Sequence, residues 1–385
     1  MLAKSRVRDL RLRPTVPSRV LLVAICVIVS SGGLIAQSNI AELNETGWRL
    51  LKSGDGPRAA KVFAEALEAQ PNNPVLLFGA GAAAYLQGRG KEATTSLRRA
   101  LEIAPDMTPA SMLLGQIQYS TGDVSQAIST YEKALTHAPN DAQLTSRLNS
   151  WRADAEANSG FVERRVDRFR VMFQGHIDKP LAARTTDLLE SAFWRIGKAL
   201  GAYPSDPVVV MLYTEKQFRD ITQAPEWSGG VYDGRIRIPA AGAAQSPQLF
   251  ERVLVHELTH AMIAGLAPRG IPVWLHEGLA QYFEGDDPAI ALQRLRAVGQ
   301  VVPLRYLEGS FGRLTAPQAL VAYDESLVVV DAILQRPGLD WIGLFRALTE
   351  SPRTEYTLDN FGLRYSELEE QIYRAIRPTT ASRSR

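Results

Sequence analysis

Cysteine is nearly absent from the sequence. The 385 residues include one, Cys26, which lies inside an apolar run close to the N-terminus. The rest of the chain has no thiol, which excludes a disulfide bond, a metal site with cysteine ligands and a cysteine nucleophile there. Cys26 stands among Ile and Val instead of following the small residues at the end of that run, so we do not expect it to carry a lipid.

A strong excess of one charge is also missing. Lys and Arg number 43 against 41 Asp and Glu, which gives a net charge of +2. Residues 1–19 alone carry six basic side chains and one acidic one, so everything beyond Arg19 sums to −3. A chain without a basic surface is not expected to bind nucleic acid. An apolar content of 45% is enough for packed cores, and the length makes two domains the default expectation.

The basic segment 1–19 precedes an apolar run over residues 20–36, which is the pattern of a secretory signal peptide. The length of this run also reaches the lower limit for a membrane-spanning helix, so a cleaved signal and a retained single membrane anchor both stay open. Because basic residues remain on the cytoplasmic side, both alternatives predict that the later residues are exported to the periplasm or another extracytoplasmic space.

The same small residues recur at a constant interval across residues 42–143, where Gly47 is followed by Gly81 and Gly115. Small residues in register let two antiparallel helices of one unit cross closely, and the second glycine and the proline of each unit end its two helices. The interval, about 34 residues, and these positions resemble tetratricopeptide repeats, so we expect an α-helical solenoid of three repeats and a capping helix over residues 42–157. The aligned columns are Gly47, Gly81 and Gly115; Gly54, Gly88 and Gly122; Ala59, Ala93 and Ala127; Ala66-Leu67, Ala100-Leu101 and Ala134-Leu135; and Pro71, Pro105 and Pro139.

Such an array presents a concave groove that can take a peptide or a partner protein. The alternative is a spacer that holds the second domain away from the membrane, because a repeat scaffold does not by itself specify binding. The segment Asn158-Ser159-Gly160 marks the expected boundary with the second domain, and residues 378–385 are expected to form a flexible tail.

Histidine is scarce, with five in the chain, yet two of them stand in the segment His256-Glu257-Leu258-Thr259-His260. On a helix, residues i and i+4 share one face, so His256 and His260 can bind one ion. Zinc accepts neutral imidazole and, in catalytic sites, three protein ligands with one open position. Glu257 lies about 100° around the helix, where it can act on a water molecule as a general base.

A third ligand follows in the segment 271–283, which predicts a short helix opened by Pro272. The chain between His260 and Glu277 is long enough for a turn and a return helix beside the first. Two His and one Glu form a known catalytic zinc set. The pair HELTHA and WLHEGLAQYF resembles the peptidase MA-like family of gluzincins, which are zinc metallopeptidases related in active-site layout to thermolysin.

This resemblance covers about residues 165–375 and implies a role for each residue of the two motifs. Zn²⁺ is implied to be held by His256, His260 and Glu277, with Glu257 activating water. Gln281, one turn after Glu277, stands where related enzymes place a carboxylate that orients a ligand imidazole. Because Gln lacks a full charge, Glu284, a further turn along, is the alternative for this supporting role.

The resemblance also implies that an extended substrate adds to the sheet edge just before the metal helix, where residues 229–238 stand. The residues expected on that edge are Gly230, Val231 and Ile236. The alternative is an ordinary edge strand that Arg235 and Arg237 protect from aggregation.

Hydrolysis through a tetrahedral oxyanion needs a second hydrogen-bond donor. Tyr323 is the candidate, because the segment around it resembles the family's Tyr-x-x-Ser sequence; Tyr282 and Tyr306 are its competitors, and a tyrosine that only packs is the alternative. His276, next to Glu277, faces about 100° away from it and is expected to line the cleft without binding the ion.

Hydrophobic patterns place the remaining elements of the second domain, residues 161–377. Alternation predicts a strand over 166–173, helical spacing predicts a helix over 185–200, and a continuous apolar run predicts a central strand over 208–213. A turn and a strand are expected over 229–239, followed by the metal helix over 248–265. The predicted class is α+β: a helical repeat solenoid followed by a gluzincin-like metallopeptidase domain with a small mixed sheet and active-site helices.

The sequence therefore predicts an exported zinc-dependent endopeptidase that acts on a protein or peptide, with repeats that recruit the substrate or a partner. The alternative is an envelope assembly adaptor that uses the repeat groove and keeps an idle peptidase fold. The presence of all three ligands and the general base favours the enzyme. The sequence does not specify the substrate or the oligomeric state.

Overall fold

The structure is a computed structural model, and it describes residues 33–174, 179–222, 229–351 and 353–377. The basic segment 1–19, residues 20–32 of the apolar run and the tail 378–385 lie outside the described residues, so the predictions for them stay predictions. None of the helices in the described ranges has the length and apolar composition needed to cross a membrane.

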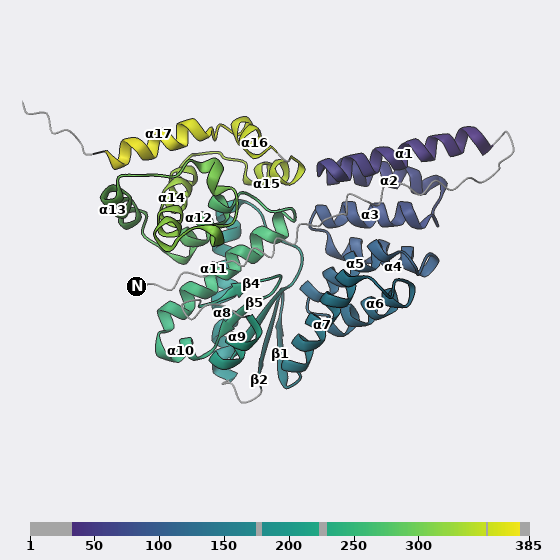
Figure 1. Ribbon diagram of the computed structural model, residues 1–385, viewed down its shortest axis with the longest axis horizontal. Helices are drawn as coiled ribbons and strands as arrows, with labels where there is room; N and C mark the ends of the chain where they lie inside the picture. The colour runs from purple at the N-terminus through teal and green to yellow at the C-terminus, as the bar shows by residue number, and fades with distance from the viewer. Residues whose placement is uncertain (1–32, 175–178, 223–228, 352, 378–385) are drawn as a thin grey trace, which may run out of the picture.

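Paired antiparallel helices form the N-terminal part, and Figure 1 shows them stacked beside the second domain. The first helix begins at Gly33, ahead of the predicted start of the array, and α7 lies where the capping helix was expected. The helices are α1 (Gly33–Ser53), α2 (Gly56–Ala69), α3 (Pro74–Leu86), α4 (Gly90–Ile103), α5 (Thr108–Ser120), α6 (Val124–His137) and α7 (Ala142–Ala157).

The aligned small residues do what their positions predicted. A Cβ at Gly47 or Gly81 would lie 2.5 Å from Phe63 or 2.8 Å from Leu97, so these glycines let the two helices of a unit approach. Gly54, Gly88 and Gly122 follow the first helix of their repeats and have positive φ angles of 87°, 66° and 89°, which glycine adopts without strain. The repeat period therefore marks real helix boundaries.

A mixed five-stranded sheet with order β1-β2-β3-β5-β4 starts the second domain. The hairpin β1/β2 is antiparallel, β3 runs parallel to both β2 and β5, and β4 pairs antiparallel with β5 at the other edge. The elements of this part are β1 (Phe161–Val166), β2 (Phe169–Gln174), α8 (Lys179–Leu200), β3 (Val208–Tyr213), α9 (Glu215–Thr222), β4 (Val231–Tyr232), β5 (Ile236–Pro239) and α10 (Ala241–Gln245).

Helices make up the rest of the domain. They are α11 (Pro247–Leu266), α12 (Val273–Glu284), α13 (Pro288–Val298), α14 (Ala316–Leu334), α15 (Trp341–Glu350), α16 (Thr354–Asn360) and α17 (Tyr365–Ile376), with short 3-10 turns at Leu304–Leu307 and Phe311–Arg313. This architecture confirms the predicted α+β class with a helical solenoid followed by a small mixed sheet and helices.

Two strand predictions differ from the structure for the same reason, a missed tight turn. The segment 166–173 was expected to be one strand, but Asp167, with φ of 42°, turns the chain between β1 and β2. The turn and single strand expected over 229–239 are instead the two strands of the hairpin β4/β5, in which Gly234 has φ of 101°. The first turn, at Asp167-Arg168, has no common two-residue signature, so the alternation of the flanking residues suggests one strand; the second contains Asp233-Gly234, a typical hairpin pair whose signal was overlooked.

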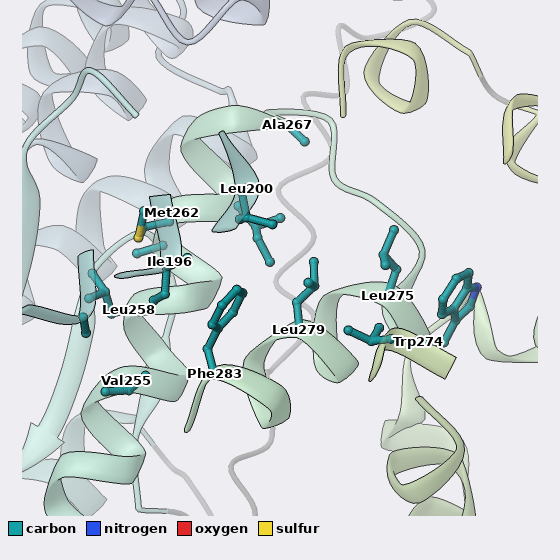
Figure 2. Close-up of a cluster of buried hydrophobic side chains, with 14 of the residues drawn as sticks. Ile196, Leu200, Val255, Leu258, Met262, Ala267, Trp274, Leu275, Leu279 and Phe283 are labelled. Atoms are coloured by element: carbon teal, nitrogen blue, oxygen red, sulfur yellow. The ribbon is translucent and has the colours of Figure 1, made fainter. Parts of the chain in front are cut away.

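The core of the second domain lies between the sheet and α8, α11 and α12. Alternate residues of β3 and β5, among them Val210, Leu212 and Ile238, face this core because successive side chains of a strand point to opposite faces. Figure 2 shows Leu258 and Met262 of α11 and Leu279 and Phe283 of α12 within one buried cluster. This packing fixes the two helices that carry the metal-binding motifs.

The repeat array contacts the second domain through its glycine turns. Ser205 donates to the carbonyl oxygen of Gly88 at 2.6 Å, and a Cβ at Gly88 would lie 2.5 Å from the carbonyl oxygen of Gly265. A Cβ at Gly54 would overlap the carbonyl oxygen of Thr349. Gly54 and Gly88, which occupy the same position in successive repeats, therefore both lie where the array contacts the second domain.

A buried polar network completes this contact. Arg235 and Arg237, each 2% exposed, donate to the two carboxylate oxygens of Asp154 in α7 at 3.0 and 2.8 Å. Arg235 also donates to the carbonyl oxygen of Tyr119 at 2.8 Å, and Arg237 donates to the Tyr119 hydroxyl at 2.9 Å. The two arginines that could have protected an exposed strand are instead enclosed between β5 and the array.

Candidate metal centre

Helix α11 carries the first motif in a buried position. Pro247 occupies its first turn, where a missing N–H is tolerated, and the side chains of the motif face the interior on several sides. His256 is 4% exposed, and Glu257 and His260 are 0% exposed. Polar groups this deep in a core need partners or a ligand, because burying them alone is unfavourable.

Helix α12 brings the third candidate ligand against α11. Gly278 permits its close approach to α14, since a Cβ there would overlap the carbonyl oxygen of Ser326. Gly285, with φ of 92°, ends the helix. Glu277, next to Gly278, is 2% exposed and points toward the two imidazoles.

The three candidate ligands converge on one point. Glu277 Oε2 lies 3.8 Å from His256 Nε2 and 3.8 Å from His260 Nε2, and the donor atoms of all three residues lie within 4.8 Å of one another. These separations are too long for hydrogen bonds. They are close to the ~3.3 Å between neighbouring ligands of a tetrahedral zinc ion with bonds of about 2.0 Å. The geometry thus fits a shared divalent ion.

The hydrogen bonds around His256 support the same interpretation. Its Nδ1 lies 2.8 Å from a carboxylate oxygen of Glu284, so Nδ1 is the nitrogen placed to donate to that carboxylate and Nε2 is the one placed to bind an ion. Among the described residues, His256 Nε2 and His260 Nε2 are buried nitrogen atoms without a hydrogen-bond partner. Buried acceptors of this kind, aimed at the same point as a carboxylate, fit a metal ion.

Burial and neighbouring charges act differently on the two imidazoles. Burial lowers the pKa of His260 well below its usual value, and the nearby His276 and His256 lower it further, so His260 is held in the neutral form that binds metal. Burial also disfavours a charged His256, but the carboxylates of Glu284, Glu257 and Glu277 outweigh it and raise the pKa of His256 to about 9. The carboxylates therefore favour a cation here, and a divalent ion would take the place of that proton.

Of Gln281 and Glu284, the two residues predicted to support a ligand imidazole, Glu284 is the one that contacts His256. Arg252 donates to Glu284 at 3.1 Å and forms an ion pair with Asp286, so the carboxylate that contacts His256 is itself held. Gln281 instead donates to the backbone carbonyl of Tyr323 at 2.9 Å. This hydrogen bond joins α12 to α14.

Glu257 lies directly beside the backbone that precedes β4. A Cβ at Gly230 would stand 2.9 Å from Glu257 Cγ and 3.1 Å from its Oε1, closer than side chains normally approach. Glycine at this position therefore leaves room for the carboxylate next to the sheet edge. The candidate general base and the predicted substrate strand are neighbours in the structure.

The predicted edge residues divide between two strands. Val231 lies on β4, the strand at this edge of the sheet, and Gly230 directly precedes it. Ile236 does not lie at the edge, because β5 is flanked by β3 and β4 and Ile236 faces the core at 0% exposure. The unrecognised hairpin turn at Gly234 is the reason: it moves the second half of the segment inward.

Tyr323 is 8% exposed and stacks edge-on against Phe311 with ring centroids 5.2 Å apart. Together with His276 and Glu277 it lines a cavity of about 1850 Å³ between the second domain and the repeat array. We call this cavity the interdomain cleft. Its residues do not include Tyr282 or Tyr306, the latter being 69% exposed. The ring of His276 packs 4.3 Å from that of His260, which places it at the cleft as expected.

Sequence reasoning missed two features of the site. Arg252 stands one helical turn before His256 and so shares its helix face, a signal that was available. The contribution of Gln116 and Tyr85, which line the interdomain cleft from the array, had no signal, because it depends on how the two parts are arranged.

Comparisons with known proteins agree with the two-part organisation. Residues 189–375 match the family model of the Peptidase MA superfamily, and residues 44–108 and 84–146 match two tetratricopeptide repeat models. The chain therefore joins tetratricopeptide repeats to a Peptidase MA superfamily domain. The resemblance to tetratricopeptide repeats is confirmed, and the resemblance to the peptidase MA-like family is confirmed at the level of the superfamily.

Curated relatives share only segments of the chain. Hsp70-Hsp90 organizing protein 1 of Glycine max is 26% identical over 27% of this chain and 18% of that protein. The CTR9 homolog of Arabidopsis thaliana is 25% identical over 40% and 14%, and small glutamine-rich tetratricopeptide repeat-containing protein 2 of Mycosarcoma maydis is 28% identical over 32% and 38%. The chain spans less than half the length of these relatives.

A solved structure, the first tetratricopeptide repeat domain of Spaghetti (RPAP3) bound to the HSP90 peptide SRMEEVD, is also similar. It is 22% identical over 31% of this chain and 94% of that chain, with a TM-score of 0.30.

Proposed function

We propose that this protein is a zinc-dependent endopeptidase of the gluzincin type that acts on proteins or peptides. One observation carries the proposal: two imidazoles and one carboxylate from separate helices point to one place, with a further buried glutamate, Glu257, in the same motif. The match of this part of the chain to the Peptidase MA superfamily supports it.

In the proposed site, His256, His260 and Glu277 hold the ion. Zinc, when bound, supplies a Lewis acid that polarises the carbonyl of the scissile peptide bond. Glu257 takes a proton from the attacking water as general base and returns it to the leaving amine as general acid. Glu284 holds the Nδ1 proton of His256, which fixes the orientation of that ring. Tyr323, on the cleft wall, donates a hydrogen bond to the developing oxyanion.

The experiment compares wild type with Glu257→Gln and with Glu251→Gln, an exposed glutamate on the same helix. Both variants should bind one zinc per chain, measured by plasma emission spectrometry after dialysis. Only Glu257→Gln should lose turnover, by a factor of about 10² or more, because general base catalysis alone contributes about that much. Terminal-peptide proteomics with the two proteins would then identify the cleaved bonds. Equal turnover in all three proteins would reject the enzyme.

We further propose that the protein acts outside the cytoplasm. The basic segment 1–19 and the apolar run after it support this location. Mass spectrometry of the mature chain separates the two alternatives, since a cleaved signal removes the apolar run and a retained anchor keeps it. Recovery of the full-length chain from the soluble cytoplasmic fraction would contradict both.

A second candidate is an envelope adaptor that binds a protein in the repeat groove and keeps an idle peptidase fold. The tetratricopeptide repeats favour it, since such arrays often bind peptides or partner proteins. The adaptor differs from the enzyme in one measurable way: if the protein is an adaptor, the Glu257→Gln variant performs its function as well as the wild type does.

A further inference from the structure

The interdomain cleft has walls from both parts of the chain. On the side of the second domain, Glu277, His276 and Tyr232 line it, so it reaches both the metal centre and the end of β4. On the side of the array, Tyr85 of α3 and Gln116 and Ser120 of α5 line it. The first helices of the second and third repeats therefore line the same cavity as Glu277.

The two walls are held together firmly. The enclosed pair of arginines on Asp154 and the glycine turns described above join the array to the sheet and to the loop after α11. Arg269 of that loop also donates to the carbonyl oxygen of Lys52 at 3.1 Å. An array fixed in this way does not act as a mobile arm, and whatever enters the cleft touches both parts.

We propose that an extended, unfolded polypeptide segment occupies the interdomain cleft, with the repeat array forming one wall of the substrate site. The segment pairs with the β4 edge on one side and contacts α3 and α5 on the other. This inference rests on the proposed function for the position of the scissile bond, which lies beside Glu257. It changes the role of the repeats from separate recruitment to direct contact with the substrate.

The size of the cleft favours this occupant. Its volume of about 1850 Å³ exceeds the roughly 300–1,000 Å³ of pockets for drug-sized ligands. A folded domain of about 100 residues has a radius of gyration of about 13 Å and is too large to enter. An extended chain fits both limits, because β4 ends the sheet among the described strands and can pair with a further strand.

The charge of the lining argues against a polyanion. Arg252 and Arg294 are occupied by Asp286 and Asp324. Further acidic side chains, Asp206, Asp233 and Glu308, also line the cleft. A cavity with mixed charge and many carboxylates does not provide the basic track that nucleic acids require. A polypeptide, whose backbone is recognised by hydrogen bonds, suits it better.

The test places a photo-cross-linking residue, p-benzoylphenylalanine, in the full chain carrying Glu257→Gln. One protein carries it at position 116 and the control at position 143, an exposed glutamine on α7 that does not line the cleft. The probe is a biotin-labelled library of random tetradecapeptides. We expect at least tenfold more labelling at position 116, competed by unlabelled tetradecapeptides and not by a library of tetrapeptides.

Equal labelling at positions 116 and 143, or complete competition by the tetrapeptide library, would overturn the proposal. Lys52, exposed at the end of α1 and part of the same wall, provides a second cross-linking position if the change at 116 prevents folding. Since binding is measured in a protein without general base, the result does not depend on turnover. If position 116 is labelled but the wild-type protein cleaves no peptide, the peptide-binding cleft is supported and the proposed hydrolase is rejected.

A kinetic comparison adds an independent readout. Gln116→Trp fills part of the cleft, whereas Gln143→Trp adds the same side chain to the surface of α7. Gln116→Trp should raise KM at least fivefold for tetradecapeptides and leave cleavage of a blocked tetrapeptide unchanged. An equal loss of cleavage for both peptide lengths would instead indicate damage to the metal centre. It would contradict the proposal that Gln116 contacts only the distant part of a long substrate.

Discussion

Replacing Asp154 by Asn tests whether the repeat array and the second domain form one unit. Asp154 is 6% exposed and accepts hydrogen bonds from Arg235, Arg237 and the hydroxyl of Tyr119. Asn has nearly the same shape, but it is neutral and one of its two oxygen acceptors becomes a donor. The change therefore leaves two buried guanidinium groups facing an amide.

The expected loss follows from this burial. Breaking a buried ion pair by removing one partner costs about 3–5 kcal/mol, because the remaining charge stays buried. Arg237 keeps an ion pair with Asp233 at 3.0 Å, so we expect the lower half of that range, about 3 kcal/mol. With an unfolding entropy of about 2.1 cal/mol/K per residue, a cooperative unit of 385 residues would show a fall in Tm of roughly 4 °C.

The assay is thermal unfolding followed by near-ultraviolet circular dichroism, with Glu156→Gln as the matched control. Glu156 is exposed and lies close to Asp154 on α7, so it removes the same charge without touching the network. We expect Asp154→Asn to lower Tm and the control to change it by less than about 1 °C, the range of ordinary surface substitutions. A fall of equal size in both variants, or in neither, would refute the inferred contribution of the network.

The pH dependence provides a second check. Burial disfavours the charged form of Asp154, but Arg237 and Arg235 outweigh it and hold the pKa of this carboxyl below its usual value. A folded-state pKa below that of the unfolded chain contributes stability above the unfolded value, about 3.9, and this contribution is lost as the pH falls through the folded value. The difference between wild type and Asp154→Asn should thus be constant from pH 8 to 5 and shrink below about pH 4.

Three further variants test the candidate site and the core. Gly230→Ala should lower kcat about tenfold or more with unchanged zinc content, because its Cβ would lie 2.9 Å from Glu257 Cγ; loss of zinc instead would place the damage at the ligands. Glu284→Gln should weaken zinc binding by about 10–100-fold in a chelator competition, since it removes the charge that holds His256 Nδ1; an unchanged affinity would show that Glu284 does not support the ligand. Glu325→Gln should stabilise the protein at pH 8 and have little effect at pH 4. Burial raises the pKa of Glu325 to about 8, so the wild type loses stability as the pH rises from the unfolded pKa, near 4.3, toward 8. Urea midpoints that are the same for the variant and the wild type at both pH values would contradict this.

The fold was predictable where a pattern repeats or is long. Gly54, Gly88 and Gly122 recur at one period, and each marks the end of a helix with positive φ. The helix of His256 and His260 was bounded within one residue at either end, because Pro247 at its start and Gly265 and Pro268 at its end are strong local signals. The tight turn at Asp167 was missed because it interrupts a continuous alternation without a strong signal, whereas the turn at Gly234 was missed although Asp233-Gly234 is a typical hairpin pair.

The candidate site was predictable to the extent that it lies on two helices close in sequence. The spacing of His256, His260 and Glu277 fixes their faces, and the structure brings their donor atoms together. The supporting contacts were harder to predict. Gln281 and Glu284 were both open from sequence, and the choice depends on how α12 rotates against α11, which tertiary packing decides.

Arg235 and Arg237 show why the relation between the two parts lay beyond sequence reasoning. Two arginines separated by one residue on a strand share a face, and on an edge strand they would protect that face from aggregation. Here the hairpin moves them onto an inner strand, and their face meets α7 and Asp154, which lies far earlier in the chain. The charge pattern alone supports either arrangement.

This enclosure also decides how the repeats can be studied. Deleting residues 42–157 would remove Asp154 and Tyr119, the array's partners of Arg235 and Arg237, and would uncover Val209 of β3, which lies beside Gly122. Loss of activity in such a truncated protein would follow from an altered sheet next to Glu257, whether or not the repeats touch the substrate. Point variants on the cleft wall, such as Gln116→Trp, leave the network intact, and they can therefore separate substrate contact from structural support.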